Sequence, residues 1–324
     1  MTATVICTAK PGSKKWLSMR PGGIGASEVA TMLGLNPYQT AVDLWLAKTG
    51  KAEGFTGNYA SRRGQHLEAF VLAAYADAHP DTIVEAYPDI PSMLAHPDVP
   101  EARCSPDALG HNPATSLAIE VKTAGHRQRG KWADGAVPDA YALQVMYQLA
   151  VTGLDLGHIA ADVAGDYEER VVVRDDALCD RLIDAVAKWW RDHVVADVMP
   201  TPDPVRDRDR LADLWVPNPD LPPARVGHDL ANELRDAKAA AAAAKTDLEV
   251  AAARVQIAMQ SATEAVTPDG DVVAKWTASK PRESIDTKAL AADLPDVAAT
   301  YMRTGKPGRR FTIAGGRSER NRNE

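Results

Sequence analysis

Apolar and polar positions change period several times along the first 200 residues. Helical spacing predicts short helices at 25–34, capped by Ser27 or a preceding glycine, and at 40–48, and a longer helix that begins at Ser61. The apolar face of that longer helix is predicted to consist of Leu67, Phe70, Val71, Ala74 and Tyr75. Extended segments are predicted at 83–88, 102–109, 117–122, 157–163 and 168–174, and further helices at 139–152 and 176–198. This order predicts an α/β fold, with a central mixed sheet flanked by helices.

The pattern divides the chain into five parts. Residues 1–15 are expected to form an N-terminal arm, and residues 16–199 a single α/β domain. Seven prolines between residues 200 and 226 predict a Pro-rich linker over 200–227. Residues 228–262 predict an Ala-rich helix or helical hairpin that packs on its own protein or docks a partner. Residues 263–324 predict a small β-hairpin region and a basic tail.

Composition and charge narrow the class of protein. Apolar residues make up 45% of the 324 positions, and no apolar run approaches the length of a membrane helix. The N-terminus lacks the apolar core of a signal peptide, so we expect a cytoplasmic protein without membrane contact. Net charge is −7, but residues 1–65 and 303–324 each carry +5. Two explanations fit basic ends around an acidic middle. The protein could be an enzyme that binds metal and DNA, or the charges could be surface charges that are unevenly distributed along the chain.

The most informative stretch runs from residue 105 to residue 122. Alternation within its strand puts Glu120 and Lys122 on one face, and a hairpin would bring Asp107 beside Glu120. Two carboxylates at a strand pair form an oxygen site suited to Mg²⁺, with Mn²⁺ as an alternative. Lys122 would lie next to that metal. A structural ion pair among the three residues remains the alternative explanation.

Two helices add polar side chains to inward faces. Glu68 shares a helical face with Val71 and Tyr75, so its carboxylate needs a partner such as a metal, or lies at a solvated edge. Gln144, Tyr147 and Gln148 follow at helical spacing and could hold a carboxylate or a water, or mark a polar helix surface. The spacing of glycines and Lys131 in residues 125–131 is similar to that of a P-loop. The next residue is Trp132, however, whereas a P-loop has a Ser or Thr there that binds Mg²⁺, so a P-loop is not expected. The basic residues in that segment fit a DNA backbone better, namely Arg127, Arg129 and Lys131.

Four blocks in this order resemble the YqaJ-like viral recombinase and phage lambda exonuclease family of PD-(D/E)xK nucleases. The resemblance covers residues 16–185, and more loosely 264–313. The blocks are WLSMRPGGIGASEVATMLGLNPYQTAVDLWLAKTG, RRGQHLEAFVLAAYA, CSPDALG with AIEVKTAG, and ALQVMYQLAVTGLDLGHIAADVAG. The family implies a restriction-endonuclease-like core, here with a C-terminal helical and β-hairpin extension.

The resemblance also implies roles for individual residues. Asp107 and Glu120 would be metal ligands helped by the Val121 carbonyl, Lys122 would be the catalytic lysine, and Glu68 and Gln144 would complete the site. Arg20 and Ser27 have the spacing used to hold a terminal 5′ phosphate. The Asp107-to-Glu120 spacing is wider than usual in the family. Tyr147 falls one position early for the QxxxY form, so its supporting role is the weakest of the set.

These features together predict a Mg²⁺-dependent exodeoxyribonuclease that degrades double-stranded DNA from 5′ to 3′ in phage-type homologous recombination. The family further implies a single-strand annealing protein as partner, a homotrimeric ring, and a phage or prophage gene expressed in the bacterial cytoplasm. Two alternatives stay open at this point. One is a structure-specific or Cas4-like endonuclease, and the other is a catalytically inactive DNA-binding protein with a nuclease fold.

Overall fold

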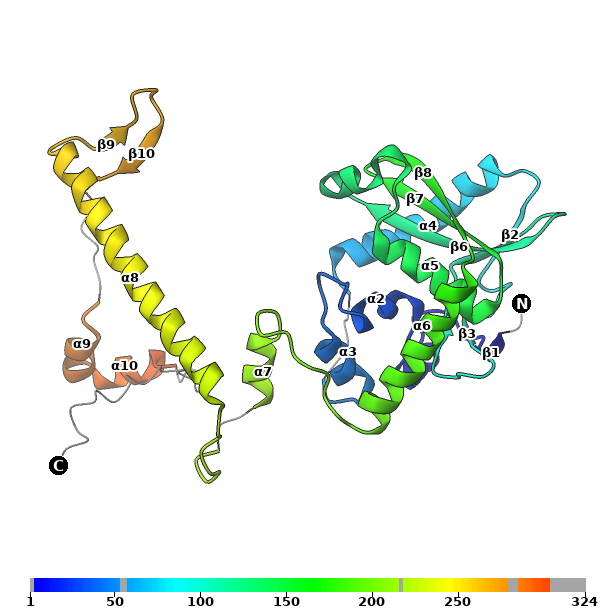
Figure 1. The fold of residues 1–324 in the computed structure, drawn as a ribbon, viewed down its shortest axis with the longest axis horizontal. Coiled ribbons are helices and arrows are strands. Elements are labelled where there is room, and N and C mark those ends of the chain that lie inside the picture. Colours follow the sequence, from blue (N-terminus) through cyan, green and yellow to red (C-terminus); the bar gives the residue numbers. More distant parts are fainter. Residues whose placement is uncertain (1–2, 53–56, 216–217, 279–284, 304–324) are drawn as a thin grey trace. The chain divides into compact units, whose positions relative to one another are not determined.

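The structure is a computed structural model that describes residues 3–52, 57–215, 218–278 and 285–303. The chain divides into two compact units, Met1–Leu214 and Trp215–Glu324 (Figure 1). The first unit contains β1 (Thr4–Cys7), α1 (Lys14–Met19), α2 (Val29–Met32), α3 (Ala41–Lys48), α4 (Tyr59–Ala78), β2 (Ile83–Ala86), β3 (Met93–Ala95), β4 (Arg103–Cys104), β5 (Ala108–His111), β6 (Ser116–Ala124), α5 (Asp139–Thr152), β7 (Leu156–Val163), β8 (Asp166–Val173), α6 (Asp176–Trp189) and α7 (Arg208–Leu214). Short 3-10 turns lie at Arg20–Gly22, Ala26–Glu28 and His126–Gly135, and a π-helical turn at Trp190–Val195.

A five-stranded mixed sheet in the order β2-β5-β6-β7-β8 forms the centre of the first unit. Only the β6–β7 pair is parallel, with Glu120 opposite Ile159, and the other neighbours are antiparallel. The connection between β6 and β7 contains α5, as a parallel crossover requires. The predicted α/β class with a central mixed sheet flanked by helices is confirmed.

Alternation along β6 gives the sheet two different faces. Leu117, Ile119 and Val121 pack against Val71 and Tyr75 of α4. Ala118 of the same strand instead belongs to the larger core, which also contains Val145 and Leu149 of α5 and Ile159 of β7. Helices α4 and α5 therefore cover opposite faces of the sheet (Figure 1). Because Glu120 and Lys122 alternate with Ile119 and Val121, their side chains belong to the α5 face.

Two glycines fix the path of the chain around α5. Gly153 ends the helix in the left-handed conformation, at φ 71°, and its N–H donates to the Leu149 carbonyl. Gly157 lies where α5 crosses β7, and a Cβ atom there would come within 2.3 Å of Val145 Cγ1. The absence of a side chain at Gly157 thus lets α5 approach the sheet closely.

The N-terminal segment departs from the predicted loose arm. Residues 4–7 form β1, which pairs with β3 in a three-stranded sheet of order β1-β3-β4. The extended segment predicted at 102–109 also differs from the prediction, because it divides between two sheets. Its first part, Arg103–Cys104 (β4), pairs with β3, whereas Ala108–His111 (β5) pairs with β2 and β6. A bend around Pro106 between these pairings has no counterpart in the polarity pattern.

Helix boundaries follow capping more closely than apolar spacing. Thr40 caps α3, with its side chain accepting from the Asp43 N–H. The cap of α4 is Asn58, and Ser61 is the third helical residue of a capping box, not the first. Gly25, one of the predicted capping glycines, precedes the short turn before α2. On α4, Val71 and Tyr75 are buried as predicted, but Phe70 is exposed because it lies beyond the edge of the buried stripe.

The second unit contains α8 (His228–Met259), β9 (Glu264–Val266), β10 (Val272–Lys275), α9 (Thr287–Asp293) and α10 (Pro295–Tyr301). α8 is a single helix of 32 residues, not a helical hairpin, and β9 and β10 pair as an antiparallel hairpin. The predicted basic tail lies largely outside the described residues, which end at residue 303. In the described part, no helix combines the length and the apolarity needed to span a bilayer.

We predict that Gly157→Ala destabilises the first unit by about 1–3 kcal/mol, because the new methyl group overlaps Val145 in a packed interface. Each kcal/mol should lower Tm by roughly 2–4 °C for a unit of this size. Gly125→Ala is the matched control, since a Cβ at Gly125 meets nothing within 4 Å. Equal thermal unfolding curves for the two variants would contradict the close approach of α5 to β7.

Candidate functional site: a carboxylate cluster at one end of the central sheet

The β5–β6 hairpin brings Asp107 beside the strand that carries Glu120. Asp107 immediately precedes β5, and Ala108 pairs with Ile119 on β6. The Asp107 Oδ2 atom accepts a hydrogen bond of 2.8 Å from the Val121 N–H. This places the aspartate as predicted, and the Asn112–Thr115 turn joins the two strands of the hairpin.

Glu120 is buried, with 3% of its surface exposed, and its carboxylate is surrounded by donors. The Lys122 ammonium pairs with Oε1. Gln144 donates to Oε1 at 2.5 Å and Gln148 donates to Oε2 at 2.6 Å. Because Gln144 and Gln148 are one helical turn apart on α5, the two amides hold both carboxylate oxygens from one helix face.

Glu68 reaches the same region from α4. Burial raises the pKa of Glu68, and the Glu120 carboxylate raises it further, whereas Lys122 opposes the shift. The pKa of Asp107 is raised well above its usual value by burial first and then by Glu120, with Glu68 adding to the effect. For Lys122, burial lowers the pKa, but Glu120 and Asp107 more than offset it, and the net shift is upward. The cluster therefore has three carboxyl groups and one cation in a space poorly reached by water.

All four groups line one cavity of about 310 Å³, together with Gln144, Arg20 and Ser27. The sheet supplies Asp107, Glu120 and Lys122, and the N-terminal segment supplies Arg20 and Ser27, which form another part of the cavity wall. The structure thus brings together residues predicted from four separate sequence blocks.

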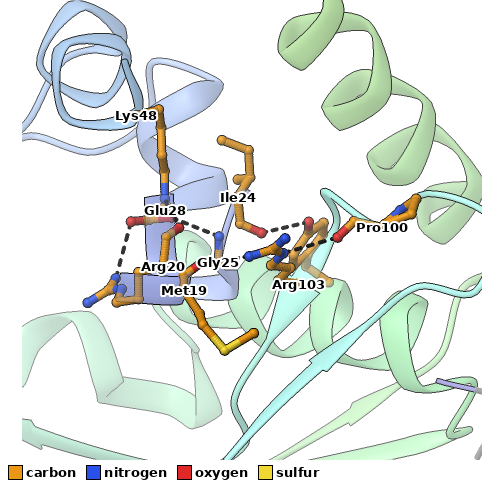
Figure 2. A network of polar contacts seen from close by, with 9 residues as sticks. Met19, Arg20, Ile24, Gly25, Glu28, Lys48, Pro100 and Arg103 are labelled. Atoms are coloured by element: carbon orange, nitrogen blue, oxygen red, sulfur yellow. Dashed lines mark hydrogen bonds and ion pairs between the residues drawn. The ribbon is translucent and has the colours of Figure 1, made fainter. Parts of the chain in front are cut away.

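A network around Glu28 forms part of that wall (Figure 2). Glu28 accepts from Arg20 Nη2 at 3.1 Å, from Lys48 Nζ at 2.6 Å and from the Gly25 N–H at 2.8 Å. Lys48 also donates to the Arg20 carbonyl at 3.0 Å, and burial lowers its pKa. Nearby, Arg103 donates to the Met19 carbonyl at 2.6 Å. The sequence pattern predicted no role for Glu28 or Lys48. The signal that could have identified Lys48 was a lysine on the otherwise mainly apolar helix 41–48, where it is buried.

Tyr147 does not join the site. Its side chain is fully buried, and its hydroxyl donates to the Ile24 carbonyl at 3.0 Å. Gln148, one position later, occupies the place beside Glu120. The predicted supporting role of Tyr147 is therefore structural: it fastens α5 to the N-terminal segment that carries Arg20. Spacing explains the difference, since the residue at i+4 from Gln144 is Gln148.

The predicted basic loop is a 3-10 segment, His126–Gly135, that follows β6. Arg127, Arg129 and Lys131 are exposed there, and none lines the cavity described above. Arg129 pairs with Asp166 at the start of β8. Their predicted contact with DNA stays a prediction and would extend beyond the carboxylate cluster.

The donor set fits a hard divalent cation. Asp107 Oδ2 is bonded to Val121, and among the described residues no hydrogen bond reaches Oδ1 or either oxygen of Glu68. Glu120 Oε2 accepts one hydrogen bond and keeps a second lone pair. Buried carboxylate oxygens left with free lone pairs are the ligands that Mg²⁺ and Mn²⁺ prefer.

Comparison with known proteins agrees with the sequence blocks. Residues 15–155 match the model of the YqaJ-like viral recombinase domain, so this stretch of the chain is similar to that family. The chain is 27% identical over 193 residues to the uncharacterized protein YqaJ of Bacillus subtilis (strain 168), a match covering 58% of this chain and 59%, less than two thirds, of that protein. The resemblance stated from sequence is thereby confirmed for residues 15–155, and the looser one at 264–313 stays a prediction.

The solved structures to which this chain is similar include an alkaline exonuclease from Laribacter hongkongensis. It is 22% identical, with a TM-score of 0.48, and the match covers 63% of this chain and 100% of that one. A phage related exonuclease from Haemophilus somnus 129PT is 14% identical, with a TM-score of 0.39, over 54% of this chain and 96% of that one.

We predict that Asp107→Asn raises the Tm of the metal-free protein. Asn keeps an acceptor for the Val121 N–H and removes one of the three carboxyl groups. Each kcal/mol of stability gained should raise Tm by roughly 2–4 °C. The raised pKa means that folded Asp107 holds its proton more tightly than the unfolded chain does. The destabilisation is therefore absent below the usual carboxyl pKa of about 4, grows as pH rises from there to the folded value, and is constant above it. Melting curves across pH in chelator-treated buffer measure it, and a lower Tm for Asp107→Asn at neutral pH would contradict the electrostatic account.

Proposed function

We propose that this protein is a metal-dependent deoxyribonuclease, and specifically an exonuclease that degrades double-stranded DNA from 5′ to 3′ during phage-type recombination. The observation that carries the proposal is the convergence of Glu68, Asp107, Glu120 and Lys122 on one cavity within a YqaJ-like viral recombinase domain. Buried carboxylates beside a lysine are costly to maintain, and phosphodiester hydrolysis uses both kinds of group.

Mg²⁺, with Mn²⁺ as an alternative, would be held by Asp107 and Glu120, with the Val121 carbonyl and Glu68 as further oxygen donors. Bound there, the cation supplies a Lewis acid that lowers the pKa of a water and screens the phosphate charge. Gln144 and Gln148 fix the orientation of Glu120 through both of its oxygens. Lys122 is then placed to orient the attacking water or to stabilise charge on the phosphate in the transition state.

The 5′-to-3′ direction of degradation is proposed from the residues that the N-terminal segment contributes to the cavity. Glu28 holds Arg20 through Nη2 only, and among the described residues the Nε and Nη1 groups of Arg20 donate no hydrogen bond. Ser27 is exposed beside it. A guanidinium with two free donors and a neighbouring hydroxyl suits a terminal 5′ phosphate. The annealing-protein partner and the trimeric ring stay predictions from the family resemblance.

The first activity test compares variants of the cluster on linear and covalently closed double-stranded DNA with Mg²⁺. Asp107→Asn should abolish degradation, because the cation site loses a charged ligand, and Lys122→Ala should lower kcat by roughly 10²–10³-fold. Asp98→Asn removes an exposed carboxylate outside the cavity and should keep full activity. The wild-type protein should degrade only the linear form. Cleavage of both forms would favour an endonuclease, binding without cleavage an inactive DNA-binding protein, and full activity of Asp107→Asn would remove the proposed site.

The second test addresses the 5′ phosphate. A hydrogen bond to a charged group is worth about 1.5–3 kcal/mol, so Arg20→Ala should slow degradation of 5′-phosphorylated ends by about ten- to 150-fold. Ends with a 5′ hydroxyl should be affected little. Arg181→Ala, an exposed arginine on α6 that does not line the cavity, is the control. An unchanged ratio of initial rates on the two kinds of end would show that Arg20 does not bind the phosphate.

A further inference from the structure

A second cluster of metal-ligating side chains lies on the other face of the central sheet. His158 on β7 and Glu169 on β8 face α4, because they share rows of the sheet with Ile119 and Val121, which pack against that helix. His79, the residue that ends α4, completes the cluster. The ligand atoms of His79, His158 and Glu169 all lie within 4.8 Å of one another.

We propose that His79, His158 and Glu169 form a zinc site that is separate from the carboxylate cluster. Two imidazoles and one carboxylate are a common protein ligand set for Zn²⁺, whereas Mg²⁺ prefers oxygen ligands alone. His79 Nε2 lies 2.8 Å from Glu169 Oε2, and His158 Nδ1 lies 3.1 Å from Glu169 Oε1. Tetrahedral zinc with bonds of about 2.0–2.2 Å needs donor atoms about 3.3–3.5 Å apart, so these two pairs of atoms would have to separate by about half an ångström.

The rings are held in place by their neighbours. His79 stacks on Tyr75 with ring centroids 4.4 Å apart, and its backbone N–H donates to the Tyr75 carbonyl. The Tyr167 hydroxyl donates to Glu169 Oε2 at 3.0 Å and so orients the carboxylate. Burial lowers the pKa of His158, although Glu169 opposes the shift, which favours the neutral imidazole that a metal requires. The ligands therefore need little reorganisation to bind.

Tyr75 gives the site a measurable competitor. Its side chain is fully buried, and its hydroxyl lies 2.9 Å from His158 Nδ1, the same nitrogen that faces Glu169. Burial, together with the nearby Glu169, raises the pKa of Tyr75 to about 12, so the phenol stays neutral and is not a ligand at neutral pH. A zinc ion must displace the Tyr75 hydroxyl from that nitrogen. Removing the hydroxyl should therefore strengthen zinc binding, the opposite of what the loss of a ligand does.

Occupied by zinc, the site would fasten the C-terminal end of α4 to β7 and β8. Glu68 lies on the same helix, about three turns before His79. Zinc would thus stabilise the helix that carries one carboxylate of the cavity without entering the cavity itself. His79 and Glu169 are partly exposed, which leaves a fourth position open to water.

The test is a zinc titration of the full-length, chelator-treated protein, with a chromophoric chelator as competitor and excess Mg²⁺ to occupy the carboxylate cluster. Wild-type protein should bind one tight equivalent of Zn²⁺ per chain and gain thermal stability on binding. His79→Gln should lose tight binding, while Tyr75→Phe should bind about two- to tenfold more tightly. His111→Gln is the matched control, because among the described residues His111 lies near one carboxylate, Glu85 at 3.3 Å, and near the Ser116 hydroxyl at 2.9 Å, so this variant should bind as wild type does.

Circular dichroism of each variant establishes that the fold is intact. Co²⁺ should give the visible absorption of a tetrahedral complex in the wild-type protein and in His111→Gln, but not in His79→Gln. The proposal is overturned if folded wild-type protein binds no zinc under these conditions, or if His79→Gln binds it as tightly as wild type. In either case, the cluster would be a hydrogen-bonded network only.

Discussion

The burial of the Glu120 carboxylate constrains the rest of the first unit. A carboxylate in an apolar interior costs several kcal/mol unless charge and hydrogen bonds compensate for it. Here the compensation comes from Lys122 two residues along the same strand and from Gln144 and Gln148 on α5. Because both amides belong to one helix, satisfying Glu120 also fixes the rotation and height of α5 above the sheet. Gly157 allows the close approach that these hydrogen bonds require.

The position of α5 also determines where the residues that line the cavity lie. Residues 145–152 of α5 are buried, and the Tyr147 hydroxyl donates to the Ile24 carbonyl, next to the turn in which the Gly25 N–H donates to Glu28. The segment with Arg20 is thereby held at the cavity that the carboxylates line, although more than 80 residues separate it from Asp107 in sequence. On the other face of the sheet, α4 contributes Glu68 to the cavity and His79 to the second cluster.

The sequence supported much of this arrangement because its signals are local. Strand alternation placed Glu120 with Lys122, the 13-residue interval from Asp107 to Glu120 fitted a hairpin, and helical spacing located the helices at 40–48 and 139–152. What it missed depends on tertiary contacts. The pairing of Glu28 with Lys48 and the meeting of His79 with His158 join residues about 20 and 80 positions apart, and no periodicity encodes them. The prediction for Tyr147 was wrong because Tyr147 and Gln148 are consecutive polar residues on α5. The helix directs Gln148 toward Glu120 and Tyr147 toward the Ile24 carbonyl.

The central claim is that Asp107 and Glu120 hold a divalent cation while Gln144 and Gln148 keep Glu120 in place. The most direct measurement is anomalous diffraction from crystals grown with Mn²⁺. The account predicts a manganese peak bonded to carboxylate oxygens of both Asp107 and Glu120, with the two amides still donating to Glu120. A Glu120 carboxylate that remains paired with Lys122, with no manganese between it and Asp107 at saturating Mn²⁺, would contradict it.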